Sequence, residues 1–550
     1  MIRGRRFRAW FALLFLLAAV LLVAMGIFGS GAPEPTGVRL DRVAFTGVRV
    51  VEPELVQASE PQTILVSAGK IESIYPVEAL SVPPGYTEVA LPGRFVVPGY
   101  WNMHAHLGRL QVHYAAPMML MHGIFYARNM SGDCVGWMCW FIPDADENRA
   151  LTHAATRGDL MVPAFIGGIG SHVIRGSRVA PSWDYPAEPK YLAPSTYEEG
   201  RALARHAASR GVDFLKPYNS LHPEALRGLI DEADALGLYV GGHVPRGLTL
   251  DDAIELGLRT VEHGRMLPLA CSTLDEEFAS DYRAWLDAPA GTVDKPSLSQ
   301  MLGELLQSPD DAACSAVLAA WSEKGAYYVP THVTRLADTV AADRPFIDDP
   351  RARTVPSLVL RWGWEAQASE YETMIRDDPD LAGELRALYE RGVALTGQAH
   401  EAGVGVMVGS DTGDVLIYPG ESFHEEMRIF ADAGMSPAAI LAAATSVPAE
   451  FAGLSATHGS VAVGKRADLV FLSANPLVTI ENADAINALY VGGRFYDEDA
   501  RNEVIEEVAR KSRGLPHHLA VGWFVVTRLI PGAAMRGMTR LRNRIDEALN

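Results

Sequence analysis

The sequence predicts an α/β fold: a closed (β/α)8 TIM barrel, with a small β-sandwich built from both chain ends. Short apolar runs that end in Gly, Pro or Asp alternate with helical stretches such as residues 222–237 and 248–257. This alternation is typical of a parallel sheet. Two β-rich stretches, residues 38–76 and 458–496, flank the alternating region. Neither stretch can bury a core alone, so we expect them to pack together.

Eight runs in the central region have the character of buried strands that feed loops. They lie around residues 97–106, 123–130, 162–169, 214–218, 239–244, 260–264, 327–333 and 404–411. Eight such βα units close into a barrel whose active site lies at the C-terminal ends of the strands. Side chains at those ends are therefore expected to meet at one mouth.

His104 and His106 lie at the end of the first run, in VVPGYWNMHAHLG. Residues i and i+2 of a strand point to the same side, so both imidazoles would leave the strand together. Neutral imidazole is the commonest metal ligand among side chains near pH 7. Alone, the pair could also be core histidines with satisfied hydrogen bonds.

Four more polar residues end later runs: Lys216 in VDFLKPY, His243 in YVGGHVP, His263 in TVEHG and Asp411 in VMVGSDTGD. Each has a plainer interpretation, as a solvated lysine, a strand cap or a turn former. Their shared position at strand ends favours metal chemistry. Zinc accepts His nitrogen and carboxylate oxygen, and a bound metal lowers the pKa of water toward about 7. Asp411 is placed to take a proton from the attacking water and pass it to a leaving amine.

These motifs resemble the amidohydrolase superfamily, in particular its members related to imidazolonepropionase and prolidase. The resemblance extends from about residue 38 to residue 496, and includes the C-terminal phrases GKRADLV and VGGRFY. It implies two divalent metal ions, for which zinc is the expected element. In that pattern His104, His106 and Asp411 bind one ion, and His243 and His263 bind the other. It also implies that Lys216, carboxylated by CO₂ to a carbamate, bridges both ions.

Other polar residues near the strand ends are candidates for contact with a small-molecule substrate, with a structural role as the alternative. They are His172, Tyr218, His332 and Arg335. Five further histidines are expected to lie outside the site: His400 and His424 as structural residues, and His206, His222 and His458 at the surface.

Length and composition agree with one large catalytic domain and a satellite. The chain has 550 residues, of which 48% are hydrophobic, and a net charge of −19. That charge argues against nucleic-acid binding. We expect a barrel over residues 96–454, sandwich parts over 36–95 and 455–500, and a tail over 501–550. Residues 267–324 form an insertion of the kind that makes lids or specificity elements.

The N-terminal region, residues 1–35, is expected to direct export. A basic start, MIRGRRFR, precedes an apolar run over residues 9–28. This run is either a membrane anchor or a signal peptide that is cleaved near Ala32. The expected location is therefore extracytoplasmic, membrane-anchored or secreted. The apolar and then basic C-terminal tail could lie in a membrane interface, or dock on the barrel or on a second subunit of a homo-oligomer.

The four cysteines do not predict a zinc ribbon, because only Cys134 and Cys139 are closely spaced and no second such pair exists. Cys134 and Cys139 share one loop and could form a disulfide in an oxidising compartment. Cys271 and Cys314 are expected to be free and buried.

The sequence thus predicts an exported, metal-dependent hydrolase of amide-type C–N bonds. The resemblance implies a cyclic amide or a dipeptide as substrate. Lactone or phosphoester hydrolysis at the same site is an alternative. A noncatalytic, membrane-tethered binding protein is another.

Overall fold

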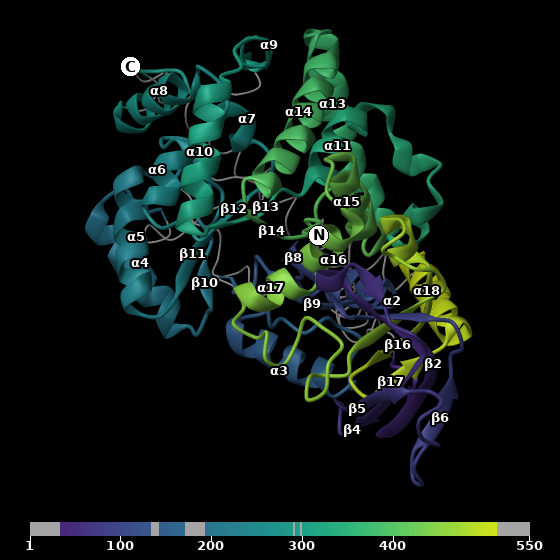
Figure 1. Ribbon diagram of the computed structural model, residues 1–550. Coiled ribbons are helices and arrows are strands. Elements are labelled where there is room, and N and C mark those ends of the chain that lie inside the picture. Colours follow the sequence, from purple (N-terminus) through teal and green to yellow (C-terminus); the bar gives the residue numbers. More distant parts are fainter. Residues whose placement is uncertain (1–33, 134–141, 171–192, 290–291, 298–299, 514–550) are drawn as a thin grey trace, which may run out of the picture.

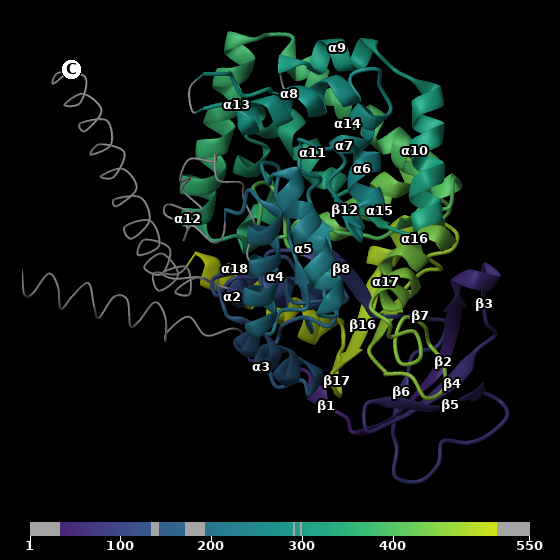
Figure 2. The same ribbon diagram turned by 90° about the vertical axis from the view of Figure 1, so that its left-hand side faces the viewer.

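The computed structural model describes residues 34–133, 142–170, 193–289, 292–297 and 300–513. It has a mixed α/β fold with a curled parallel sheet at its centre and a largely antiparallel sheet at one end (Figure 1). The helices of the insertion lie at the opposite end of the molecule from this second sheet, as both views show (Figure 2).

The central sheet is parallel throughout. Five of its strands pair in chain order: β10 (Phe214–Leu215), β11 (Tyr239–Gly242), β12 (Thr260–Glu262), β13 (Tyr327–Val329) and β14 (Gly405–Val406). Two more, β8 (Tyr100–Ala105) and β9 (Ile124–Asn129), pair with each other. Parallel bridges link β9 through residues 164–170 to β10, and one bridge links Ala105 of β8 to Thr412 beyond β14. The sheet therefore curls back toward its first strand.

Strand is observed within seven of the eight predicted runs, and three details correct the prediction. Residues 162–169 form only isolated bridges. The run at 97–106 is divided at Gly99, where a Cβ would lie 2.3 Å from the Phe125 ring, so that Val97 belongs to β7 (Phe95–Pro98) in the other sheet. The run at 327–333 ends at Val329, because helix α11 (His332–Val340) begins three residues later.

The second sheet joins both ends of the chain, as predicted. Its ten strands are β1 (Val38–Arg39), β2 (Arg42–Glu52), β3 (Gln57–Ala58), β4 (Gln62–Ser67), β5 (Lys70–Pro76), β6 (Thr87–Ala90), β7, β15 (Leu469–Leu472), β16 (Ile486–Val491) and β17 (Arg494–Tyr496). The order β1-β17-β16-β15-β7-β2-β4-β5 places the C-terminal strands beside N-terminal ones, as the yellow and purple ribbons of Figure 1 show. Phe45 packs against Phe471 and Tyr490 at ring distances of 4.8 and 5.2 Å, so the two ends share one core.

Helices surround the central sheet. They are α2 (Gln111–Met121), α3 (Ala145–Thr156), α4 (Tyr197–Ser209), α5 (Pro223–Ala235), α6 (Leu250–Glu255), α11, α12 (Ser357–Val359), α13 (Glu365–Asp377), α14 (Leu381–Glu401), α15 (Glu421–Asp432), α16 (Pro437–Ala444) and α17 (Ser446–Phe451). Shorter turns are η1 (Pro53–Leu55), η5 (Ala341–Asp343), η6 (Pro345–Ile347), η7 (Pro350–Thr354), η8 (Leu360–Trp364) and η9 (Ile480–Asp484). The amphipathic α4 begins with a capping box made by Thr196 and Glu199, which satisfies backbone N–H groups of the first turn.

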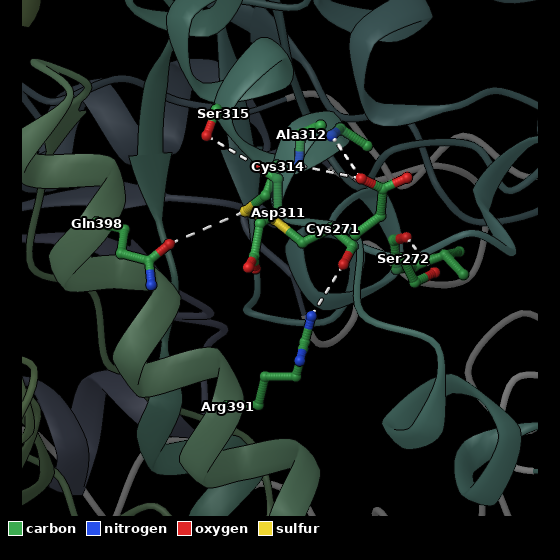
Figure 3. Close-up of a disulfide and its surroundings, with 11 residues drawn as sticks. Cys271, Ser272, Asp311, Ala312, Cys314, Ser315, Arg391 and Gln398 are labelled. Atoms are coloured by element: carbon green, nitrogen blue, oxygen red, sulfur yellow. Dashed lines mark hydrogen bonds between the residues drawn. A yellow bond between two sulfur atoms is a disulfide. The ribbon is translucent and has the colours of Figure 1, made fainter.

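The described residues of the insertion include four helices, and a disulfide links the end of the first to the last. They are α7 (Met266–Ala270), α8 (Asp275–Asp287), α9 (Leu302–Gln307) and α10 (Asp311–Lys324). Cys271 and Cys314 are bonded to each other (Figure 3), so the expectation that they are free is wrong. Asp310 N donates to Cys271 O at 3.0 Å, and this contact brings the start of α10 against the end of α7. Cys134 and Cys139 lie outside the described residues.

The described part of the tail is helical. Helix α18 (Glu498–Ser512) packs on α2, with Arg501 Nε donating to Met121 O at 2.6 Å. Residues 514–550 and the apolar run at 9–28 lie outside the described residues. Within the described ranges, no helix has the length and apolar character that a membrane span requires.

Candidate metal centre

The six residues predicted to bind metal lie together in the structure. Lys216 Nζ lies 3.3 Å from His104 Nε2 and 3.4 Å from His106 Nε2. Asp411 Oδ1 lies 3.4 and 3.2 Å from the same two nitrogens. The His263 ring is 4.6 Å from the rings of both His104 and His243. Residues from five separate strands or strand ends therefore converge on one centre.

The four histidine rings share one arrangement: each is held through its Nδ1 by a polar side chain. The pairs are His104–Glu262 at 2.7 Å, His106–Ser131 at 2.6 Å, His243–Asn219 at 2.8 Å and His263–Thr331 at 2.8 Å. An imidazole fixed in this way offers its Nε2 lone pair to an ion, and metal-ligating histidines almost always have such a partner.

Glu262 and Arg128 form a buried ion pair behind His104. Both side chains are fully buried, and Arg128 Nε also donates to Met103 O at 2.7 Å. The sequence analysis did not identify either residue. A carboxylate in the apolar strand TVE was a usable signal, because a buried Glu requires a partner.

The backbone at the centre adopts conformations that side chains rarely take. His263, Thr331 and Asp411 have φ values of 65°, 47° and 56°, in the left-handed region that favours glycine. Such strain is often found at functional sites, where the surrounding structure holds it in place. Here Asn102 contributes, since its Oδ1 accepts from the backbone N–H of both His104 and Ser410 at 3.2 and 3.1 Å.

Burial keeps the imidazoles neutral. It lowers the pKa of His106 to about 4 and the pKa values of His243 and His263 well below their usual value. Burial also lowers the pKa of Lys216 to about 8, so part of this amine is unprotonated near neutral pH. Burial alone would raise the pKa of Asp411, but the neighbouring histidines outweigh it and hold that pKa well below its ordinary value.

The centre fits divalent metal ions. Ligand atoms of His104, His263 and Asp411 all lie within 4.8 Å of one another. Within the part of the chain that the structure describes, the buried Asp411 Oδ1 has no hydrogen-bond donor, as expected for an oxygen that faces an ion. Imidazole nitrogen and carboxylate oxygen are the ligands that zinc accepts in catalytic sites.

Comparison with known proteins identifies the family of this chain. A model of the amidohydrolase family matches residues 197–496. The chain belongs to the amidohydrolase family. The resemblance inferred from its motifs is thereby confirmed.

Solved structures of low identity share the fold of this amidohydrolase. Bottromycin amidohydrolase superposes with a TM-score of 0.63 at 21% identity, over 90% of this chain and 93% of that one. A putative prolidase from Bifidobacterium longum superposes with a TM-score of 0.55 at 22% identity, over 86% of this chain and 100% of that one. A Xaa-Pro dipeptidase with bound methionine superposes with a TM-score of 0.57 at 17% identity, over 83% of this chain and 100% of that one. No curated protein matches the chain.

Of the residues expected to contact substrate in the amidohydrolase, Tyr218 lies beside the metal centre and His332 packs against a helix. The Tyr218 ring lies 4.1 Å from the His243 ring, at the edge of the centre. His332 is fully buried, and its Nε2 hydrogen-bonds Thr396 Oγ1 at 2.7 Å, so it packs against α14. His172 lies outside the described residues.

Three arginines gather beside the centre, and two of them lie near carboxylates. Arg335 pairs with Asp338, and Arg265 Nη2 lies 3.9 Å from the same carboxylate. Arg246 makes no ion pair with any described carboxylate. Burial lowers its pKa, and the charges of Arg265 and Arg335 lower it further. The arrangement favours a ligand with a negative charge.

The remaining histidines lie away from the centre. His400 is on α14 and His424 is buried on α15. His206 and His222 are half-exposed, and the Nδ1 of His222 caps α5. His458 is also half-exposed, and its ring packs against the rings of Trp101 and Tyr126 at 5.9 and 5.2 Å.

Proposed function

We propose that this amidohydrolase uses two divalent ions, most suitably zinc, to hydrolyse an amide-type C–N bond in a small molecule. The observation that carries the proposal is the set of four imidazoles, each held through Nδ1 and gathered around Lys216 and Asp411. Six ligands are too many for one tetrahedral ion. His104, His106 and Asp411 would hold one ion, and His243 and His263 the other.

Lys216 is proposed to carry a carbamate that bridges the two ions. Its amine is buried among imidazoles, where an ammonium beside two cations would be repelled. Addition of CO₂ to the neutral amine forms an N–C bond and releases one proton, leaving two anionic oxygens. When bound, the ions would polarise the substrate carbonyl and lower the pKa of a water molecule.

Asp411 is the proposed proton carrier. Water adds its oxygen to the carbonyl carbon, and Asp411 takes the proton that is released. The same proton then passes to the nitrogen as the C–N bond breaks, so the products are a carboxylic acid and an amine. The position of Asp411 among the imidazoles supports this role, because it places the carboxylate beside the proposed ions.

The substrate is proposed to carry a negative charge near the scissile bond. Arg246 would bind that group beside Tyr218, with Arg265 and Arg335 adding to the positive field. A dipeptide carboxylate fits this arrangement, and the names of the prolidase and dipeptidase neighbours agree with it. The arginines also suit a phosphoester, which remains the second candidate.

A metal measurement and a substrate panel test the function together. Protein purified without chelator should contain metal, and two ions per chain should be lost when His104 and His263 are both replaced by Gln. Among dipeptides, cyclic amides, lactones and phosphoesters, dipeptides with a free carboxylate should be cleaved fastest. Faster cleavage of phosphoesters would support the alternative. Absence of metal, and of any gain in activity on adding zinc, would support the noncatalytic alternative.

We further propose that the curled sheet is a closed (β/α)8 barrel over residues 96–454, with a β-sandwich from residues 36–95 and 455–500. The parallel bridge between Ala105 and Thr412 supports closure. A crystal structure with eight continuous strands around one axis would test it.

Export of the enzyme is proposed on the basis of the basic and apolar start. The disulfide between Cys271 and Cys314 supports it, because disulfides persist mainly in oxidising compartments. N-terminal sequencing of the mature protein tests the mode of attachment. A start near Ala32 would identify a cleaved signal, whereas an intact start would support an anchor. Protection of the enzyme from protease added outside the cytoplasmic membrane would exclude export.

A further inference from the structure

A second group of histidines and carboxylates lies apart from the metal centre. His122 ends α2, His424 lies on α15 and Asp484 ends η9, and their ligand atoms all lie within 4.8 Å of one another. Glu421, also on α15, approaches the other side of His122. These four residues are called the junction cluster below, because they connect helices of the central sheet to the turn that precedes β16.

We infer that the junction cluster binds a divalent transition-metal ion, with zinc the best fit. Zinc bonds to His nitrogen and carboxylate oxygen of about 2.0–2.1 Å place neighbouring ligand atoms of a tetrahedral site about 3.3–3.4 Å apart. Asp484 Oδ1 lies 3.5 Å from His122 Nδ1 and 3.6 Å from His424 Nε2. These two distances therefore match a single tetrahedral ion to within a few tenths of an ångström, and the ligand atoms of His122 and His424 lie within 4.8 Å of each other.

The orientation of His122 points to a ligand. Its side chain is nine-tenths buried, and its Nδ1 has no hydrogen-bond partner among the described residues. A buried ring nitrogen without a partner costs free energy, and an ion beside Asp484 would remove that cost.

Glu421 and Gly420 hold the His122 ring in place. Glu421 Oε1 lies 3.7 Å from His122 Nε2, the carboxylate-behind-histidine arrangement that orients metal ligands. Gly420 has a φ of 90°, and a Cβ there would lie 2.5 Å from the His122 ring. The close approach of this ring therefore depends on glycine.

His424 changes its hydrogen bonding when an ion binds. Its Nε2 lies 2.9 Å from the backbone oxygen of His122, to which it donates when protonated. Binding of an ion requires the other tautomer, with the proton on Nδ1, so Nε2 turns its lone pair to the metal. The His122 carbonyl oxygen then lies close enough to serve as a further ligand.

Access and charge are suited to a structural ion that exchanges with solvent. The Asp484 side chain is 34% exposed and that of Glu421 is 21% exposed, so an ion can enter from the surface. Three cations lie near the cluster: Arg501 of α18, Arg428 of α15 and Arg351. Arg501 Nε donates to Met121 O, and Arg351 pairs with Asp349 and Glu425. Among the described residues, no ion pair joins Arg501 to either carboxylate. An ion here would join α2, α15 and η9.

The test compares metal content and heat stability in the full-length protein. The variants are Asp484→Asn, which removes one charged ligand at constant size, and Glu481→Gln, an exposed control on the same turn. Protein treated with chelator is titrated with Zn²⁺ or Co²⁺. Wild type and Glu481→Gln should bind one ion more per chain than Asp484→Asn. That extra cobalt should give the visible absorption of a four-coordinate nitrogen and oxygen site.

The metal centre is removed from the comparison by repeating the titration in a His104→Gln/His263→Gln background. One ion should still bind there, and Zn²⁺ should raise the melting temperature unless Asp484→Asn is added. Equal metal content and equal thermal response with and without Asp484→Asn would overturn the inference. Because this background lacks the proposed catalytic ligands, failure of the proposed function leaves the result unaffected.

Discussion

The amidohydrolase contains two groups of histidine and carboxylate side chains that differ in their construction. The metal centre takes its ligands from the ends of parallel strands, and each imidazole there has a fixed partner at Nδ1. The junction cluster takes its ligands from the ends of a helix and a turn and from the body of another helix. It has no lysine among its ligand candidates, and its Asp484 is partly open to solvent.

In the two proposals above, the difference separates a catalytic from a structural use of the same ligand types. Chemistry requires a proton carrier, an open coordination position and a water-excluding environment. At the metal centre Asp411 is the proposed proton carrier. Asp411 and Lys216 are both buried there, which limits the access of bulk water. The junction cluster can hold an ion between elements but has no comparable proton carrier. Matched substitutions in the two groups should therefore affect different properties.

The largest effect is expected from Lys216→Ala. Loss of the bridging group should remove metal from the centre and reduce activity to background, while the junction cluster keeps its ion. Short carboxylic acids should restore part of the activity by supplying two oxygens. Metal content and kcat/KM measure both effects.

The control is Lys324→Ala, which replaces an exposed lysine paired with Glu255 and should behave as wild type. Full activity of Lys216→Ala would remove the lysine from the site, and a high-resolution map with a plain amine between two ions would exclude the carbamate.

Asp411→Asn should lower kcat by roughly 10²–10⁴-fold, the usual contribution of general acid–base catalysis. Most of the metal should remain, because the four histidines and Lys216 still hold the ions, whereas the amide cannot carry the proton. Turnover is measured at saturating substrate, together with metal content. Asp432→Asn at the exposed end of α15 is the control. An unchanged kcat in Asp411→Asn would mean that another group transfers the proton.

The sequence predicted which six residues lie together at the candidate metal centre, because each follows a buried apolar run and parallel strands bring such positions to one edge. Glu262, Arg128 and Asn102 were missed, because their roles depend on which residues they face. The junction cluster was missed for the same reason: His122 and His424 are 302 residues apart, and no periodic pattern connects them to Asp484. The pairing of Cys271 with Cys314 similarly depends on how α7 and α10 approach.

The carboxylates behind the histidines allow a direct comparison of the two groups. Glu262→Gln should weaken metal binding at the centre by about 10–100-fold. It should also destabilise the fold by about 3–5 kcal/mol, because Arg128 loses its buried partner. Glu421→Gln should weaken only the junction cluster, with a smaller loss of stability. Zinc titration and denaturant unfolding measure the two quantities. Equal destabilisation by both changes would contradict the contrast between a buried and an open site.

Arg246→Leu should raise KM for a dipeptide with a free carboxylate by roughly 10–100-fold, since a hydrogen bond to a charged group contributes about 1.5–3 kcal/mol. The KM of the same dipeptide with an amidated end should change little. Arg227→Leu on the exposed face of α5 is the control. If both substrates lose affinity equally, Arg246 supports the shape of the site and does not bind the charge.

The smallest effect is expected when a chelator slowly removes metal from the protein. The order in which the two sites lose their ions should follow the solvent exposure of their ligands. The junction cluster opens to solvent through Asp484, which is 34% exposed, whereas His104 and Asp411 side chains are 0% and 7% exposed. Its ion should therefore leave first, lowering the melting temperature by a few degrees while kcat/KM stays constant. Activity should fall only in a later phase, when the centre loses its ions. Metal content, melting temperature and activity are measured on the same samples over time.

In the control variant Asp484→Asn, the early phase of metal loss should be absent and the later phase unchanged. Loss of activity in the first phase would show that the open cluster and the catalytic centre are coupled.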